Sequence, residues 1–213
     1  MKNIKLKICG MKYPENITEI AALKPDYLGF IFWEKSSRLM DVGLIPELPE
    51  TTKKVGVFVD ASATEIRSKI EQYQLDIVQL HGNESVSFCT EIKLLNVDII
   101  KVFSVGTNFD FSVLEKFLPM VDYFLFDTKG KLPGGNGVTF DWNVLENYPF
   151  KKPFFLSGGI GINELEAIKA FQKTKVVEKC IAIDVNSQFE TKPGLKNKIE
   201  LEKFKKLLYE YEI

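Results

Sequence analysis

Eight short apolar runs, separated by longer stretches with helical periodicity, recur along the sequence. They lie at residues 4–9, 27–32, 54–59, 77–80, 99–103, 123–126, 153–156 and 179–184. Runs of this length are typical of buried strands, and a repeat of roughly 22 to 31 residues fits a strand followed by a helix. Eight such units close a parallel barrel, so we predict one α/β domain over residues 1–213, a single (β/α)8 or TIM barrel.

Several of the intervening stretches carry signals for helices. Ser62 and Asn163 each provide a capping oxygen with a glutamate three residues later, which predicts that helices start there. The segment 104–119 leaves room for only a short helix. The last stretch predicts a closing amphipathic helix, because its apolar residues repeat at helical spacing through Ile199, Leu201, Phe204, Leu207, Leu208 and Tyr211.

Composition narrows the class of protein and its partners. With 213 residues and 45% hydrophobic content, the chain can bury one substantial core. A formal net charge of -1, from 28 basic and 29 acidic residues, gives no reason to expect nucleic acid or an acidic membrane as a partner. No run approaches a membrane span or a signal peptide. Cys9, Cys89 and Cys180 lack paired spacing, as in reduced proteins, so we expect a cytoplasmic location.

Two residues capable of proton transfer follow predicted strands. The carboxyl ends of the strands of a parallel barrel converge on one face, where ligands bind. Cys9 ends the first run and Asp127 directly follows the sixth. A thiolate can serve as a general base and a carboxyl as a general acid. The structural alternatives are a small buried hydrophobic residue for Cys9 and a cap of the glycine-rich loop at 129–137 for Asp127.

A glycine pair after the seventh run favours phosphate binding. Gly158 and Gly159 precede a predicted helix, an arrangement that can present backbone amides to an anion. Asn186 and Ser187, after the eighth run, would complete the phosphate site that barrels build from these two loops. A glycine cluster alone is weak, because turns use glycine widely. The position of this glycine pair after the seventh of eight strands is what favours a phosphate site.

Two other polar residues lie near strand ends. Arg38 follows the second run and could bind a carboxylate in a bidentate pair, the alternative being a solvated surface arginine. His81, the single histidine, is beside Gly82, and we rank it below Cys9 and Asp127 as a structural residue. No group of histidines, cysteines and carboxylates has metal-ligand spacing, so we expect no metal.

In their order along the chain, these motifs resemble those of the phosphoribosylanthranilate isomerases. The resemblance spans nearly the whole sequence, and the motifs are weak separately but specific together. They are KICG at 7–10, GFIF at 29–32 with Ser36 and Arg38, VGVFV at 55–59, VQLHG at 78–82, Asp127 with GGNG at 134–137 and FDW at 140–142, SGG at 157–159, and DVNS at 184–187 with Glu190, Pro193 and Gly194.

The resemblance implies a barrel enzyme of tryptophan biosynthesis. Such an enzyme converts N-(5-phosphoribosyl)anthranilate into its ketose isomer by an Amadori rearrangement, without a metal or an organic cofactor. Cys9 would be the general base and Asp127 the general acid. The other site residues implied are Arg38 for the anthranilate carboxylate, Asp184 facing the substrate near the barrel centre, and Gly158, Gly159, Asn186 and Ser187 for the phosphate.

Three positions depart from the family pattern. Gln188 stands where a glycine is expected, which affects the backbone path of the phosphate loop. Ser37 replaces an expected proline before Arg38 and loosens that turn. Asn197 occupies a usually acidic position, where it can still cap the last helix.

Two other barrel enzymes and a binding protein are the alternative functions. An indoleglycerol-phosphate synthase relies on a catalytic lysine with glutamates on inner strand positions, and a ribulose-phosphate epimerase uses a metal with paired aspartates and histidines. The residues present argue against both, since the chain has a single histidine. A phosphate-ligand binding barrel without turnover stays open, although intact Cys9 and Asp127 weigh against it. As partner we expect a small phosphosugar–anthranilate substrate, in a monomer or a homodimer.

Overall fold

The computed structural model of the protein describes residues 4–41, 43–128 and 141–210. Within these ranges, eight parallel strands form a closed barrel in chain order. The strands are β1 (Lys5–Ile8), β2 (Tyr27–Ile31), β3 (Lys53–Phe58), β4 (Ile77–Leu80), β5 (Asp98–Val105), β6 (Tyr123–Thr128), β7 (Phe154–Leu156) and β8 (Cys180–Val185). The predicted barrel fold and its eight strands are confirmed, with shifts of one or two residues at strand ends.

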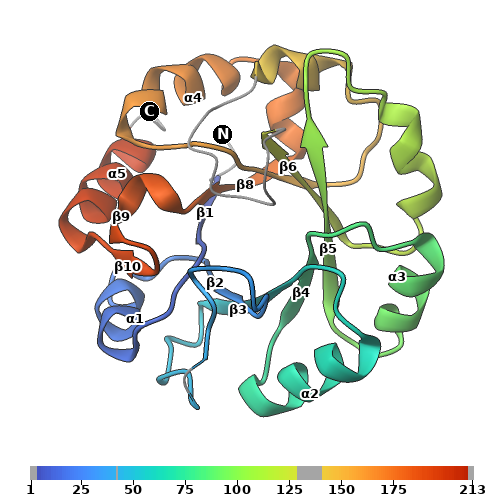
Figure 1. Ribbon diagram of the computed structural model, residues 1–213. Coiled ribbons are helices and arrows are strands. Elements are labelled where there is room, and N and C mark those ends of the chain that lie inside the picture. The colour runs from blue at the N-terminus through green and yellow to red at the C-terminus, as the bar shows by residue number, and fades with distance from the viewer. Residues whose placement is uncertain (1–3, 42, 129–140, 211–213) are drawn as a thin grey trace.

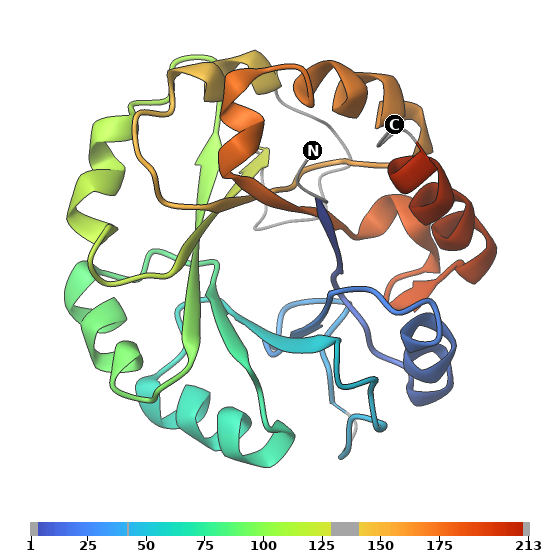
Figure 2. The same ribbon diagram turned by 180° about the vertical axis from the view of Figure 1, so that it is seen from behind.

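Helices form an outer ring around these strands (Figures 1 and 2). The α-helices are α1 (Pro14–Ala21), α2 (Ala63–Tyr73), α3 (Val86–Lys93), α4 (Leu165–Phe171) and α5 (Lys198–Glu210). Shorter 3-10 helices are η1 (Phe111–Phe117), η2 (Trp142–Asn147), η3 (Ile162–Glu164), η4 (Lys175–Lys179) and η5 (Ser187–Phe189). A two-stranded hairpin, β9 (Glu190–Lys192) and β10 (Leu195–Lys196), follows η5 and contacts α1. None of the described helices is long and apolar enough to cross a membrane.

The barrel interior changes from apolar to polar along the strands. Alternate side chains of a strand share one face, so every second residue points inward. At the amino ends the inward residues form an apolar cluster in which the Phe155 ring lies 5.1 Å from Tyr27 and 5.6 Å from Tyr123. Two residues further along their strands, the inward positions hold polar groups such as Gln79 and Asp184. The apolar layer therefore forms the floor beneath a polar end.

Two of the predicted helix signals behave differently in the structure. The Ser62 hydroxyl caps α2 as predicted, accepting a hydrogen bond from the Glu65 amide at 3.2 Å. The prediction that Asn163 caps a helix is wrong, because it lies inside η3. There the Glu164 carboxylate instead accepts a hydrogen bond from the Gly161 amide at 2.8 Å.

The segment after β2 and the end of the chain complete the ring. Among the described residues between β2 and β3 no helix forms, and this segment contains Pro46 and Pro49, which lack the amide hydrogen that a helix needs.

The short helix predicted for 104–119 is η1. The last helix is confirmed as α5, with Asn197 Oδ1 accepting from the Glu200 amide at 3.3 Å. Its Ile199 is an exception to the predicted apolar stripe, because it is 78% exposed.

We expect Phe204→Ala to destabilise the protein far more than Ile199→Ala. Phe204 is fully buried and its ring lies 5.0 Å from Phe189, so truncation leaves a cavity that costs about 3–5 kcal/mol. The matched change at the exposed Ile199 should alter the free energy of unfolding by no more than about 0.5 kcal/mol. Urea unfolding followed by circular dichroism measures both. Equal losses in the two variants would contradict this packing of α5.

Candidate active site

All the site residues predicted from the sequence line one pocket at the carboxyl ends of the strands. They come from loops and strands as far apart in the chain as β1 and η5. The pocket is lined by Cys9, Arg38, Asp127, Gly158, Gly159, Asp184, Asn186 and Ser187, together with Gln79, His81, Ser157, Gln188 and several apolar residues. Barrel closure thus gathers these side chains, whereas their individual roles stay predictions. The glycine-rich loop predicted at 129–137 lies outside the described residues.

Cys9 lies at the end of β1 in a tightly packed position. Its side chain is buried, and a Cβ placed on Gly29 of β2 would be only 2.7 Å from Cys9 Sγ. The thiol can occupy this place because residue 29 has no side chain. Burial raises the pKa of the Cys9 thiol, and the charge and hydrogen bond of Lys7 oppose this rise. The thiolate therefore forms more readily than burial alone would allow.

A buried ion pair lies directly beneath Cys9. Lys7 is two residues before Cys9 on the same face of β1, and its Nζ donates to Asp184 Oδ1 at 2.9 Å. Burial alone would lower the pKa of Lys7, but Asp184 and Cys9 raise it above its usual value. Burial raises the pKa of Asp184, and the charge of Lys7 opposes this rise. The raised pKa of Lys7 favours a charged ammonium, whereas the raised pKa of Asp184 favours a neutral carboxyl, so the two shifts disagree about the pair. The short contact between fully buried partners favours the charged pair, because an unpaired buried charge is very costly.

Asp127 is oriented from both sides at the end of β6. Its Oδ1 accepts a hydrogen bond from the Thr128 amide at 2.8 Å, and its Oδ2 lies 3.5 Å from His81 Nε2. His81 Nδ1 is in turn 3.5 Å from Gln79 Nε2, on the same strand end. Gln79 Oε1 is buried and has no hydrogen-bond partner among the described residues. His81 therefore lines the pocket beside the proposed acid, a position that its place in the sequence did not indicate.

The loops after β7 and β8 form the wall of the pocket between Asp127 on β6 and Cys9 after β1. Gly158 and Gly159 have φ values of +100° and +65°, which side chains disfavour. A Cβ on Gly158 would lie 2.1 Å from Thr128 Oγ1, so the backbone there approaches β6 closely. Gln188, the departure from the family pattern, packs its side chain toward Gly161 and also lines the pocket. This wall combines the backbone of two glycines with small polar side chains, as suits a phosphate group.

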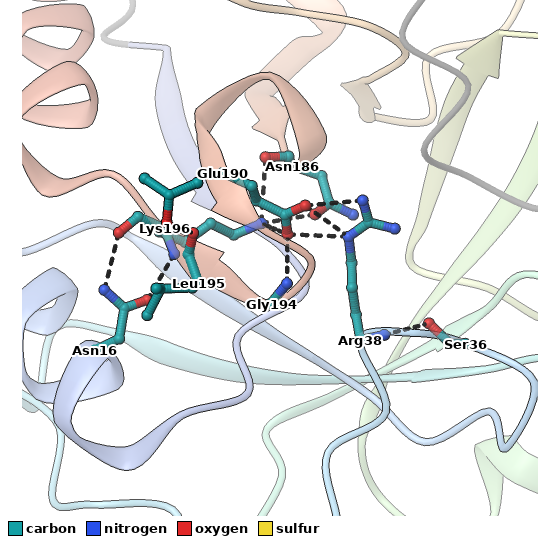
Figure 3. Close-up of polar contacts among 9 residues, drawn as sticks. Asn16, Ser36, Arg38, Asn186, Glu190, Gly194, Leu195 and Lys196 are labelled. Atoms are coloured by element: carbon teal, nitrogen blue, oxygen red, sulfur yellow. Dashed lines mark hydrogen bonds and ion pairs between the residues drawn. The ribbon is translucent and has the colours of Figure 1, made fainter.

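Arg38 is held by a carboxylate that the sequence analysis did not pair with it. Its Nε donates to both carboxylate oxygens of Glu190 at 2.9 and 3.0 Å, and its Nη2 donates to Oε2 at 2.8 Å (Figure 3). The turn before it is closed by Ser36, whose Oγ accepts from the Arg38 amide at 3.1 Å, which compensates for the missing proline at Ser37. A guanidinium has five N–H donors, so the edge formed by Nη1 and Nη2 can still bind a second carboxylate.

Two buried lysines near Cys9 were not identified from the sequence. Lys7 and Lys196 are both fully buried at their side chains, and each lowers the pKa of the thiol. The one available signal was Lys7 itself, a lysine inside an otherwise apolar strand. Within the ranges that the structure describes, no group of three or more histidines, cysteines and carboxylates could hold a metal ion.

We expect Gly158→Ala to lower the free energy of unfolding by about 1–3 kcal/mol. The new methyl group would require a left-handed backbone and would collide with Thr128. Gly43→Ala is the matched control, because nothing lies within 4 Å of a Cβ at that position. Chemical denaturation of both variants tests this, and equal stability would show that the backbone at 158 tolerates a side chain.

Comparisons with known proteins agree with this architecture. The family of N-(5'-phosphoribosyl)anthranilate (PRA) isomerases matches residues 6–207. The enzyme of that name from Parabacteroides distasonis is 41% identical over 206 residues, covering 93% of this chain and 90% of the relative. The one from Rhizobium leguminosarum bv. trifolii is 39% identical over 208 residues, covering 93% and 91%.

Solved structures of similar proteins share the barrel. Phosphoribosyl anthranilate isomerase from Thermotoga maritima has a TM-score of 0.81 at 29% identity, covering 96% of this chain and 98% of that one. A phosphoribosyl anthranilate isomerase in complex with reduced 1-(o-carboxyphenylamino)-1-deoxyribulose 5-phosphate has a TM-score of 0.78 at 27% identity, covering 96% and 98%. The Thermus thermophilus protein, with a TM-score of 0.82, 24% identity and coverage of 97% and 99%, supports the fold alone. This chain belongs to the N-(5'-phosphoribosyl)anthranilate isomerase family.

Proposed function

We propose that this chain converts N-(5-phosphoribosyl)anthranilate into 1-(2-carboxyphenylamino)-1-deoxyribulose 5-phosphate, as an isomerase of tryptophan biosynthesis. The observation that carries this proposal is the meeting, in one pocket, of a thiol, a carboxyl, an arginine and a glycine-lined wall. The substrate has a matching set of groups: a labile sugar carbon, a ring oxygen, a carboxylate and a phosphate. Family membership gives the proposal its specific substrate.

Asp127 and Cys9 carry out the two proton transfers of the rearrangement, as general acid and general base. Asp127 protonates the furanose ring oxygen, the bond from that oxygen to C1′ breaks, and the nitrogen lone pair forms an iminium. The iminium acidifies the proton on C2′, which the Cys9 thiolate removes. The resulting enolamine takes up a proton at C1′, its 2′-hydroxyl releases a proton, and the product is the ketone. Because the iminium is the electron sink, the protein has only to place the substrate and move protons.

The remaining groups hold the substrate in place. Arg38 offers its free guanidinium edge to the anthranilate carboxylate, and the backbone at 158–159 with Asn186 and Ser187 receives the phosphate. Asp184, fixed by Lys7 and by Ser157 Oγ at 3.3 Å, faces the middle of the substrate. His81, 3.5 Å from Asp127, keeps the acid oriented toward the pocket.

The setting of this activity follows from the same chemistry. The described cysteines are all free and buried, which fits a reducing compartment, and we propose the cytoplasm. We propose one domain over residues 1–213 with its site at the carboxyl ends of the strands. We propose that the protein is a monomer or a homodimer.

Replacing either proton carrier should abolish most turnover while preserving binding. We expect Cys9→Ser and Asp127→Asn each to lower kcat by about 10²–10⁴-fold, the usual contribution of a general acid or base. Loss of substrate fluorescence with freshly generated substrate measures turnover, and calorimetry measures product binding. Cys89→Ser is the matched control, because Cys89 is buried in α3 away from the pocket. Wild-type kinetics in Cys9→Ser would refute its role as the base.

Arg38→Ala should weaken binding more than it slows the chemical step. Loss of a charge-assisted bond of about 1.5–3 kcal/mol corresponds to a KM about 10- to 100-fold higher. Arg67→Ala is the matched control, because Arg67 is exposed on α2. If instead KM stayed constant and kcat fell, Arg38 would not be the carboxylate ligand. A wild-type protein that binds product without turnover would favour the binding-only barrel.

A further inference from the structure

Beside the pocket, one carboxylate is shared by two cations. Glu190 accepts from Arg38 Nη2 at 2.8 Å and from Lys196 Nζ at 2.7 Å (Figure 3). The exposed fractions of the three side chains are 5% for Glu190, 17% for Arg38 and 0% for Lys196. Two positive charges and one negative charge leave this cluster with a net charge of +1. Arg38 lines the pocket, whereas Glu190 and Lys196 lie behind it.

The hairpin that carries Lys196 is fixed to the barrel. The backbone amide of Lys196 donates to Asn16 Oδ1 at 2.7 Å, and the backbone carbonyl of Lys196 accepts from Asn16 Nδ2 at 2.9 Å. Its Nζ also donates to Asn186, at 2.7 Å from the side-chain oxygen and 3.2 Å from the carbonyl. Glu190 Oε1 accepts a further hydrogen bond from the Gly194 amide at 3.0 Å. Neither charge can turn away without losing several bonds, so the ammonium is a permanent neighbour of the carboxylate.

The cluster determines the net positive charge that a ligand meets at Arg38. Glu190 alone would cancel the charge of Arg38, and a second carboxylate at the free guanidinium edge would then meet a neutral pair containing a nearby anion. Like charges at short distance in a buried setting repel strongly. With Lys196 on its other side, Glu190 is already neutralised. The positive charge of Arg38 then remains available.

We propose that Lys196 is the charge-balancing residue of the carboxylate site: by offsetting Glu190, it leaves one positive charge on Arg38 for the incoming ligand. Lys196 acts through Arg38 and does not touch the substrate, so it is a positioning residue. This inference rests on the proposed function, because the carboxylate in question is that of the anthranilate group.

The proposal also predicts a pH dependence. Burial lowers the pKa of Lys196 to about 8, opposed by Glu190 and Cys9 and strengthened by Arg38. These three are the charged or titratable groups that act on it, from β9, the end of β1 and the segment after β2; Asn16 and Asn186 are neutral. As the pH rises through about 8 the ammonium loses its proton, and affinity for a carboxylate ligand should fall.

The test compares two probes by calorimetry. Reduced 1-(o-carboxyphenylamino)-1-deoxyribulose 5-phosphate carries the carboxylate, and ribose 5-phosphate lacks it. Lys196→Met should weaken binding of the first by about tenfold or more. Because Lys196 Nζ also bonds to Asn186 in the phosphate wall, binding of the second probe should weaken too, but clearly less than that of the first. Lys192→Met, a charge removed from an exposed position of the same hairpin, is the matched control and should change neither.

A second variant separates charge balance from a structural role. Adding Glu190→Gln to Lys196→Met removes the carboxylate together with the ammonium, while the amide oxygen can still accept from Arg38. We expect the double variant to recover most of the lost affinity. No recovery, or unchanged affinity in Lys196→Met, would overturn the proposal.

Two further results keep the test decisive. If Lys196→Met fails to fold, the double variant and the wild-type pH titration with both probes replace it, and equal pH profiles for the two probes would overturn the proposal. Wild-type protein that binds the carboxylate probe without turning over substrate would overturn the proposed function alone. Wild-type protein that binds neither probe would overturn both.

Discussion

The buried ion pair between Lys7 and Asp184 marks the level at which the barrel changes from core to site. Below it, inward side chains such as Phe155 fill the interior with apolar contacts. Above it, charged groups are kept away from bulk water, and a buried charge is tolerable only when it has a partner. The 2.9 Å contact provides that partner for two buried charges and holds the floor of the pocket beneath Cys9. The acid, the base and the binding groups are all arranged around this level.

Polar side chains lie in pairs or clusters at several places around the pocket. Arg38 and Lys196 share Glu190, and Asp127 faces His81. The Arg38–Glu190 contact joins two loops separated by 152 positions, whereas Glu190 and Lys196 belong to one hairpin. Such pairs cost desolvation, and they are better explained by the orientation and charge they give to the site than by added stability. Pre-orientation of this kind is what a proton-transfer reaction needs from a protein.

The sequence could predict which residues gather, but not how they pair. Cys9, Asp127 and Gly158 were predictable because each lies at or just after the end of an apolar run, and the ends of parallel strands meet on one face. Local signals also predicted the Ser62 cap correctly, since it depends only on residues within one turn. The Asn163 cap was wrong and Ile199 departs from the apolar stripe, because the competing Glu164 carboxylate and the path of α5 depend on surrounding structure.

By itself, the sequence determined the barrel fold, its eight strands and the face on which the site lies, because the periodicity of apolar residues and the order of strands are local properties of the chain. Only the tertiary structure decided that Glu190 is shared by Arg38 and Lys196, and that His81 lies beside Asp127. The physical reason is that these contacts depend on distances of a few ångströms between separate loops. Those distances are fixed by barrel closure and side-chain packing, which no spacing along the chain encodes.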